Sequence, residues 1–339
     1  MPERTLPESE TPLLALHDVS KRFTKPADAI DRVARVFGAG KPEEVVHAVD
    51  HVSLDIRRGE VVGLVGESGC GKSTLGRMAV GLHALSSGTR QWQGDDVDAM
   101  PAARQRTLRL AMQMIFQDPY ASLNPRLRVE AIVGEAPVAH GIVPRSERSD
   151  YVAELLQRVG LDPALARRFP HQFSGGQRAR IGIARALAVK PELLVCDEAV
   201  AALDVSIQAQ VLNLFTRLRD ELDLTYLFIS HDLGVVRHIS DRVVIMYLGR
   251  IVESAPTGEL FAHPNHPYTI GLLASAPTLE VKKISFQPVA GEMPSPLHPP
   301  SGCHFHPRCP HAMPRCRVEQ PLLKEVAPQH FSACHLNDD

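Results

Sequence analysis

Apolar residues recur along the chain with two different spacings. Short apolar runs of strand type lie at residues 13–23, 48–56, 60–65, 111–116, 193–196, 225–229 and 243–252, the last read as a terminal hairpin. Longer stretches with apolar residues at helical spacing lie at residues 101–110, 145–159, 177–188 and 206–222. Strands that alternate with helices in this way predict an α/β fold built on a mixed sheet.

The pattern also divides the chain into two predicted domains. Residues 1–262 carry the alternating strands and helices, and residues from about 122 to 187 are mostly helical in character. Residues 263–339 are rich in proline and histidine and contain one helical piece, at 268–276. We therefore predict an α/β domain with a helical insertion, followed by a small C-terminal domain.

A glycine-rich loop between strand 60–65 and the next helix fits the pattern G-x-x-x-x-G-K-[ST]. It reads Gly66, Glu67, Ser68, Gly69, Cys70, Gly71, Lys72, Ser73 and Thr74. A strand, a glycine turn and a helix in this order aim backbone N–H groups and a helix dipole at phosphate. Lys72 would reach the β- and γ-phosphates of ATP, and the Ser73 hydroxyl would ligate Mg²⁺. An ordinary glycine turn is the alternative, but the unbroken match favours a nucleoside triphosphate site.

Two acidic residues follow the apolar run 193–196. Asp197 stands where the second strand of a P-loop protein presents a carboxylate to Mg²⁺, and Glu198 could act as general base toward water. The alternative is that this pair caps a helix N-terminus. The intact phosphate loop favours the catalytic interpretation.

Three further features follow the same order as in a known family. Gln117 ends strand 111–116, the turn Ser174, Gly175, Gly176 and Gln177 opens a helix, and His231 follows strand 225–229. By itself the turn would be a glycine-rich helix cap, and His231 a structural histidine. With the phosphate loop and Asp197-Glu198, however, the set resembles the ATP-binding subunit of ABC transporters over residues 13–262. The resemblance implies a RecA-like core, an antiparallel β subdomain and a helical subdomain.

The resemblance also implies roles for single residues. Phe23, before a polar insertion at 24–47 with a short predicted helix at 29–37, would stack on adenine. Gln117 would sense Mg²⁺ and couple to the membrane subunits, and Asp204 belongs to a loop that crosses the dimer interface. The turn at 174–177 would contact the γ-phosphate of ATP held by the opposite subunit.

In the same family, the switch histidine, matched here by His231, holds the γ-phosphate and helps position Glu198. Ala199 follows Glu198 where the family usually has proline, and Phe173 replaces leucine before the turn. Neither change removes a group that exchanges protons, so we expect hydrolysis to survive both.

A narrower resemblance points to the oligopeptide/dipeptide importer subfamily. It rests on residues 117–126, 266–269, 291–297 and 302–310. It implies an ATPase subunit that powers uptake of di- or oligopeptides, working with a second ATPase (a paralogue, giving a heterodimer), two transmembrane permease subunits and, indirectly, an extracytoplasmic binding protein. Importers of nickel or glutathione share much of the pattern, so these cargoes are the alternative.

Four of the six cysteines crowd into the last 37 residues. Cys303, Cys309, Cys316 and Cys334 match neither a C-x₂-C zinc pattern nor a standard ferredoxin run. In the importer subfamily such a quartet is associated with a [4Fe–4S] cluster. Zn²⁺, with histidine substitutes, and free thiols are the alternatives, and a metal- or redox-sensing module that gates the ATPase is a rival reading of this part.

Composition narrows the class of partner. The net charge of −2 and the near-equal numbers of basic and acidic residues give no indication of a nucleic-acid partner. Apolar runs fall short of the roughly 18 residues that a membrane-spanning helix needs, and the polar N-terminus is unlike a signal peptide. We expect a peripheral protein at the cytoplasmic face of the membrane. A soluble ABC ATPase is the rival, although such chains usually carry two cassettes or a coiled-coil insertion.

Overall fold

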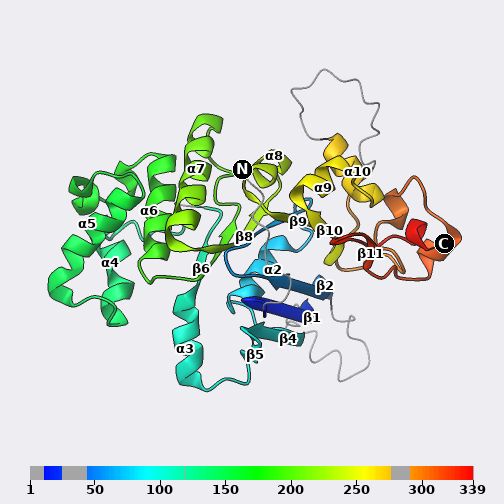
Figure 1. Cartoon of the computed structure of the whole chain (residues 1–339), viewed down its shortest axis with the longest axis horizontal. Helices are drawn as coiled ribbons and strands as arrows, with labels where there is room; N and C mark the ends of the chain where they lie inside the picture. The colour runs from blue at the N-terminus through cyan, green and yellow to red at the C-terminus, as the bar shows by residue number, and fades with distance from the viewer. Residues whose placement is uncertain (1–10, 25–43, 119, 276–290, 339) are drawn as a thin grey trace, which may run out of the picture.

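A computed structural model describes residues 11–24, 44–118, 120–275 and 291–338. These residues form two sheets, an arm of helices and a C-terminal part that lies at the opposite end of the molecule from that arm (Figure 1). The predicted helix at 29–37 lies outside the described residues.

The main sheet has eight strands in the order β11-β12-β10-β9-β3-β8-β7-β6. Its strands are β3 (Val61–Val65), β6 (Met112–Ile115), β7 (Leu193–Asp197), β8 (Thr225–Ser230), β9 (Arg242–Tyr247), β10 (Arg250–Pro256), β11 (Lys324–Ala327) and β12 (His330–Ser332). The strands from β9 to β6 pair in parallel, whereas β9, β10, β12 and β11 pair antiparallel. The parallel strands bring the carboxyl ends of β3, β6, β7 and β8 to one edge, where ligands bind in open α/β sheets.

A smaller antiparallel sheet lies against the helix that follows the phosphate loop. Its strand order is β2-β1-β4-β5. Its strands are β1 (Leu14–Thr24), β2 (Val45–Ile56), β4 (Ser87–Trp92) and β5 (Asp95–Asp96). The apolar face of β1 and β2 packs on α2 (Lys72–Ala79) and α3 (Ala102–Ala111) through residues such as Leu16, Val52 and Met78. This sheet confirms the predicted strands at 13–23 and 48–56, and adds β4, which the sequence pattern did not predict.

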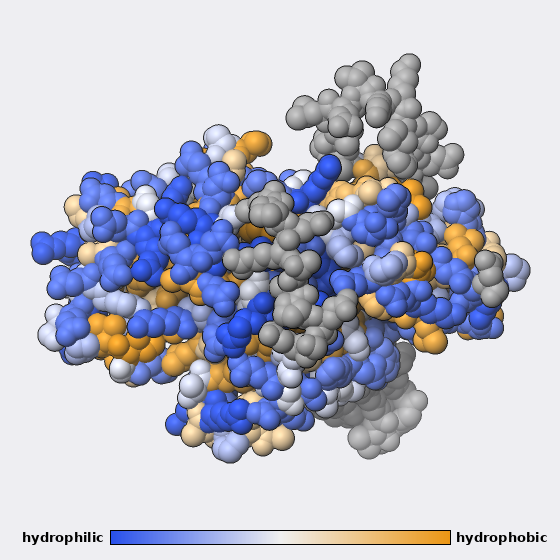
Figure 2. Space-filling model, in the orientation of Figure 1, coloured by the Kyte–Doolittle hydropathy of each residue, from blue (hydrophilic) through white to orange (hydrophobic). Residues whose placement is uncertain are grey.

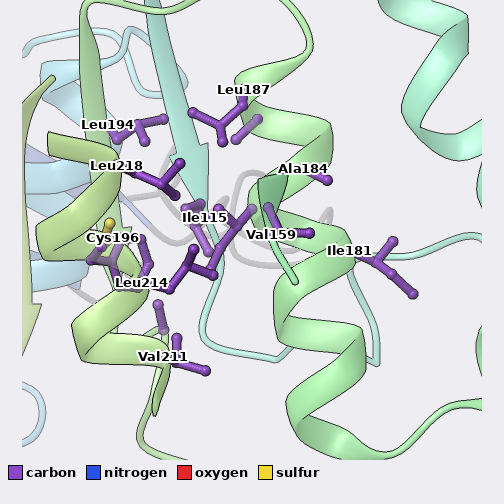
Figure 3. Close-up of a cluster of buried hydrophobic side chains, with 14 of the residues drawn as sticks. Ile115, Val159, Ile181, Ala184, Leu187, Leu194, Cys196, Val211, Leu214 and Leu218 are labelled. Atoms are coloured by element: carbon purple, nitrogen blue, oxygen red, sulfur yellow. The ribbon is translucent and has the colours of Figure 1, made fainter. Parts of the chain in front are cut away.

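The helices of the arm pack side by side at one end of the molecule (Figure 1). They are α4 (Val129–Ala139), α5 (Arg148–Arg158) and α6 (Gly175–Leu187), and α7 (Val205–Leu222) lies between them and the sheet. Val159, Leu187 and Leu214 lie in one buried cluster (Figure 3), which also includes Ile181 on the other side of α6 and Cys196 from β7. This core fixes the arm to the strand that carries Asp197.

The C-terminal part does not stand apart from the sheet. Helices α8 (Leu233–Ile239) and α9 (Thr257–Ala262) precede residues 263–339, which begin with α10 (Pro267–Ala274), and β12 then pairs with β10. The hairpin predicted at 243–252 is therefore present but is not terminal, because β11 and β12 extend the sheet beyond it. Glu253 of β10 and His330 of β12 form a buried pair 2.7 Å apart.

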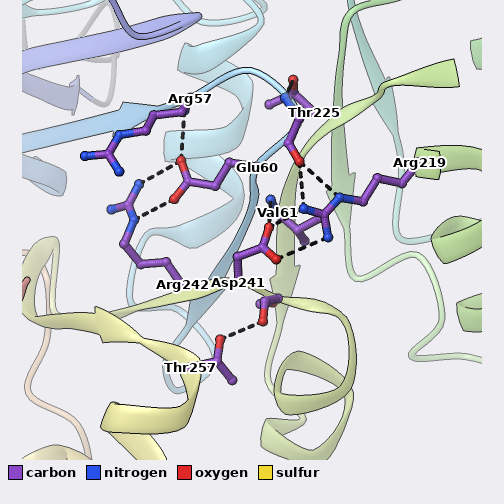
Figure 4. A network of polar contacts seen from close by, with 10 residues as sticks. Arg57, Glu60, Val61, Arg219, Thr225, Asp241, Arg242 and Thr257 are labelled. Atoms are coloured by element: carbon purple, nitrogen blue, oxygen red, sulfur yellow. Dashed lines mark hydrogen bonds and ion pairs between the residues drawn. The ribbon is translucent and has the colours of Figure 1, made fainter. Parts of the chain in front are cut away.

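Polar contacts anchor the start of β3, the strand that leads to the phosphate loop. Arg219 donates to the Gly59 carbonyl at 2.7 Å and forms an ion pair with Asp241 (Figure 4). Glu60 forms an ion pair with Arg242 (Figure 4). Asp241 in turn accepts from the Val61 N–H at 2.8 Å. These charged side chains pair with one another and with the backbone of β3. The contacts therefore fix the position of the start of β3.

Within the part of the chain that the structure describes, no helix has the length and apolar character needed to cross a membrane. Figure 2 shows hydrophobic side chains scattered among hydrophilic ones on the face in view.

Candidate functional site

The phosphate loop connects fully buried β3 to α2, as the sequence predicted. Gly71 caps α2 with φ of 108°, in the region that disfavours other residues. A Cβ at Gly71 would lie 2.1 Å from the Ala48 carbonyl oxygen, so β2 presses directly on the loop. The local sequence and this close contact together impose the loop's shape.

Lys72 lies buried in the first turn of α2. Its ammonium donates to the carbonyl oxygens of Gly66 at 2.7 Å and Glu67 at 2.9 Å. Among the described residues no carboxylate lies within 4.0 Å of this ammonium. A buried cation whose partners are two carbonyl oxygens and, at 3.9 Å, the Cys70 sulfur fits a site that receives an anion.

Ser73 and Asp197 meet at the carboxyl edge of the sheet. The Ser73 hydroxyl donates to Asp197 Oδ1 at 2.7 Å. Burial raises the pKa of Asp197, an effect that the Ser73 hydrogen bond and the charges of Arg77 and Lys72 partly offset. A hydroxyl and a carboxylate oxygen are donors that Mg²⁺ favours. These two residues therefore fit the predicted Mg²⁺ site.

Two side chains from distant parts of the chain contact the Glu198 carboxylate. Gln117 Nε2 donates to Glu198 Oε2 at 2.8 Å, and His231 Nδ1 lies 3.3 Å from the same oxygen. Glu198 has a φ of 48°, and its N–H donates to the Ile229 carbonyl on β8 at 3.0 Å. The alternative that Asp197-Glu198 caps a helix does not hold, because the next helix, α7, has Asp204 as its N-cap.

Lys72, Ser73, Gln117, Glu198 and His231 line one pocket of about 490 Å³, whereas buried Asp197 reaches it only through its contact with Ser73. The pocket wall consists of Val46, Ala48, Ser68, Gly69, Gly71, Lys72, Ser73, Thr74, Gln117, Glu198, His231 and Pro296. Three of these, Val46, Ala48 and Pro296, were not predicted from the sequence. Segment 291–297, which contains Pro296, had been singled out, but only as a mark of the subfamily.

Phe23 does not line this pocket. It lies on β1 opposite Val46, which does, and 37 % of the residue is exposed. Its ring meets the edge of His83 at 5.4 Å between centroids, with the Lys21 ammonium 5.1 Å away. Phe23 is therefore beside the site, and its contact with adenine stays a prediction.

The turn at 174–177 forms a helix cap. Ser174 Oγ accepts from the Gln177 N–H at 3.3 Å, and Gln177 Oε1 accepts from the Ser174 N–H at 3.0 Å. At Gly176 a Cβ would lie 2.4 Å from Ile207, so α6 and α7 pack closely only because this residue is glycine. Ser174, Gly175 and Asp204 are exposed, and none of the turn residues lines the pocket of their own chain.

Comparisons with known proteins agree with this geometry. Residues 49–201 match the ABC transporter family, and residues 252–316 match the oligopeptide/dipeptide transporter C-terminal region. The chain is 52 % identical over 295 residues to the oligopeptide transport ATP-binding protein AppF of Bacillus subtilis, which covers 86 % of this chain and 90 % of that protein. It belongs to the ATP-binding proteins of ABC transporters.

Other relatives of this ABC protein point the same way. A putative peptide import ATP-binding protein of Brucella abortus is 52 % identical over 311 residues, 90 % of this chain and 92 % of that protein. The structure of CbiO1 from Clostridium perfringens, part of an ABC transporter complex, aligns with a TM-score of 0.61 and 28 % identity over 75 % of this chain and 92 % of that one.

A dimeric ATP-binding cassette, solved in a post-hydrolysis state with ADP and Pi, aligns with a TM-score of 0.60 and 26 % identity over 72 % of this chain and 98 % of that one. The chain is accordingly an ATPase with the ABC cassette fold.

The four C-terminal cysteines are all free thiols. Burial raises the pKa of Cys303 and Cys309, and raises that of Cys334 to about 11. Across the described ranges, no group of three or more His, Cys, Asp or Glu side chains is arranged to hold a metal ion. The predicted [4Fe–4S] cluster, and Zn²⁺ as its alternative, therefore gain no support from the side-chain arrangement.

Proposed function

We propose that this ATPase powers uptake of di- or oligopeptides as the nucleotide-binding subunit of an ABC importer. The observation that carries the proposal is the contact of Gln117 and His231 with Glu198, beside Lys72 and Ser73 in one pocket. The peptide cargo rests on the match of residues 252–316 to the oligopeptide/dipeptide transporter C-terminal region and on the peptide-transport names of the relatives.

The residues of the pocket divide the chemistry between them. Lys72, now held by loop carbonyls, turns its ammonium toward the β- and γ-phosphates. Ser73 and Asp197 supply oxygen ligands for Mg²⁺, which, when bound, neutralises charge on the phosphates. Glu198 accepts a proton from the attacking water, with His231 and Gln117 orienting its carboxylate.

We also propose that two ATPase subunits share each ATP. The turn at 174–177 does not line the pocket of its own chain, and its residues Ser174 and Gly175 are exposed, so a second subunit can contact it. The fold is similar to that of a cassette solved as a dimer with ADP and Pi. By subfamily analogy the second ATPase is a paralogue, and two permease subunits and an extracytoplasmic binding protein complete the importer at the cytoplasmic face of the membrane.

Reconstitution tests this proposal. The tagged chain is purified with its partners from its own membranes and placed in liposomes with ATP and the binding protein. We expect di- and tripeptides to stimulate hydrolysis and to accumulate. Stimulation by nickel or glutathione instead would replace the cargo. Failure to recover any membrane partner would favour a soluble ABC ATPase.

No catalytic step is assigned to the four C-terminal cysteines. Metal at these thiols stays a prediction of the resemblance alone, and anaerobic purification with an absorption spectrum and metal analysis tests it. About four irons per chain would establish a [4Fe–4S] cluster, and one zinc would establish a structural site. Absence of both would leave free thiols and remove the basis for a metal-sensing role.

A further inference from the structure

The residue that follows the first glycine of the phosphate loop, Glu67, is held through all of its polar groups. Arg308 donates to both carboxylate oxygens of Glu67, at 3.1 and 3.0 Å. Tyr268 Oη accepts from the Glu67 N–H at 2.9 Å. The Glu67 carbonyl accepts from Lys72 at 2.9 Å. Arg308 and Tyr268 belong to the C-terminal part of the chain, and Lys72 is the phosphate-binding lysine itself.

The groups that hold Glu67 are themselves fixed by packing. Tyr268 is fully buried, and its ring lies 4.7 Å from that of Tyr247 and 5.4 Å from that of Phe305. The Arg308 side chain is only 7 % exposed and lies over the Tyr247 ring at 5.8 Å. Because these side chains have little freedom, they restrict the position of Glu67.

Another stretch of the C-terminal part reaches the same loop. Pro296 lines the nucleotide pocket, and its carbonyl accepts from the His47 N–H on β2 at 3.0 Å. A Cβ at Gly69 would lie 3.4 Å from Met293 Cε. Residues 291–297 thus lie against the loop independently of Arg308.

Charge gives Arg308 a second effect. Glu67 places a carboxylate at the loop that receives the polyanionic triphosphate, where like charges repel. Nη1 of the guanidinium donates to both oxygens of that carboxylate and offsets its charge, and the low exposure of the Arg308 side chain strengthens the contact.

We propose that Arg308 and Tyr268 are positioning residues for ATP binding: they hold Glu67, and through it Lys72, in the geometry that accepts phosphate. The C-terminal part thereby belongs to the nucleotide site. The proposal rests on ATP binding in this pocket, but not on the peptide cargo or on any metal.

A double-mutant cycle on the full-length chain tests it. ATP affinity is measured by calorimetry with Mg²⁺, and kcat at saturating ATP, for R308M, E67Q and the double variant. We expect R308M to weaken ATP binding about 10-fold, because it leaves an unpaired carboxylate beside the phosphates. The double variant should recover most of that loss of ATP affinity, and in R308M the change in affinity should exceed the change in kcat. A residue with a merely structural role would not be rescued by removing a charge at Glu67.

Arg315→Met is the matched control, because Arg315 lies in the same part of the chain and pairs with Glu319 at the surface. It should change ATP affinity less than about twofold. R308M binding within twofold of the native protein, or a double variant no better than R308M, would overturn the proposal.

Tyr268→Phe keeps the ring packing and removes only the acceptor of the Glu67 N–H, so it tests the proposal even if R308M fails to fold. We expect about threefold weaker ATP binding, with an unchanged thermal midpoint in the absence of nucleotide. Unchanged ATP affinity in Tyr268→Phe would refute the role of Tyr268. K72A tests the ATP site itself, and complete loss of ATP binding in K72A, with native folding, shows that ATP binds in this pocket. Failure of the present proposal can then be distinguished from failure of the ATP-site assignment.

Discussion

The Ser73 hydroxyl donates a hydrogen bond of 2.7 Å to Asp197 Oδ1, although 124 positions separate the two residues in the chain. The contact joins the start of α2 to the end of β7. It places the two oxygen ligands expected for Mg²⁺ side by side at the edge of the parallel sheet.

Replacing Asp197 with Asn should therefore abolish the Mg²⁺ dependence of nucleotide binding. We expect kcat to fall about 100-fold or more, because charge on the phosphates is no longer neutralised. ATP affinity in excess EDTA should change less than about threefold. Calorimetry with and without Mg²⁺, together with phosphate release, measures both effects. Ser73→Ala should act in the same direction, and Ser149→Ala, at a surface hydroxyl that donates to Glu130, is its control. Mg²⁺-stimulated binding that persists in Asp197→Asn would contradict the assignment.

Glu198→Gln should separate ATP binding from hydrolysis. Glutamine keeps the shape of the side chain but cannot accept the proton of water, so we expect kcat to drop about 1000-fold. ATP affinity should be retained, and size-exclusion chromatography of the variant with its partner ATPase and ATP should show a dimer that the native pair loses by hydrolysis. Glu192→Gln, which removes a half-exposed surface pair with Arg58, should hydrolyse ATP normally. Residual activity above a tenth of native would exclude Glu198 as the general base.

Arg219→Met should destabilise the fold. Arg219 is largely buried, and its loss leaves the Gly59 carbonyl without this donor and Asp241 without its ion pair, although Asp241 still accepts from the Val61 N–H. We expect the free energy of unfolding to fall by about 2–3 kcal/mol, since Asp241 keeps some contact with water. Arg217→Met, two positions earlier on α7 and half-exposed, should cost less than about 1 kcal/mol. Equal losses in the two variants, measured by urea unfolding, would show that burial does not matter here.

His266 should make stability depend on pH. Burial lowers the pKa of His266 from 6.5 to about 4, partly offset by a hydrogen bond with the Ala333 backbone. The unfolded chain therefore binds a proton at a higher pH than the folded chain does. Its contribution to stability is present above pH 6.5 and is lost as the pH falls toward about 4, by about 3 kcal/mol in total.

Urea unfolding between pH 7 and pH 4.5 should show a shallower pH dependence for His266→Gln than for the native protein. His263→Gln, at an exposed histidine nearby, should keep the native pH dependence. An unchanged slope in His266→Gln would mean that this histidine is not the group responsible.

Local sequence determined the phosphate loop. Its glycines, its lysine and the buried strand before it are neighbours in the chain, so a pattern of adjacent residues contains nearly all the information. The alternating strands and helices of the core follow for the same reason, because each segment's apolar spacing reflects the face that it buries.

The arrangement around Glu198 required the tertiary structure. Gln117 lies 81 positions from Glu198, and only the parallel pairing of β6, β7 and β8 brings their carboxyl ends together. Motif order suggested that Gln117 and His231 belong to one site, but no local pattern gave their shared contact with one carboxylate oxygen.

The C-terminal part shows most clearly what pattern alone misses. In β12 the buried residues are His330 and Ser332, and His330 is buried because Glu253 of β10 pairs with it. A polar residue that is buried because it is paired does not contribute to the apolar pattern along the chain. The pattern therefore predicted no strand beyond β10. The contact of Arg308 with Glu67, 241 positions away, was missed for the same reason. Apolar burial follows from residue spacing along the chain, whereas the matching of buried charges is decided only when distant segments meet.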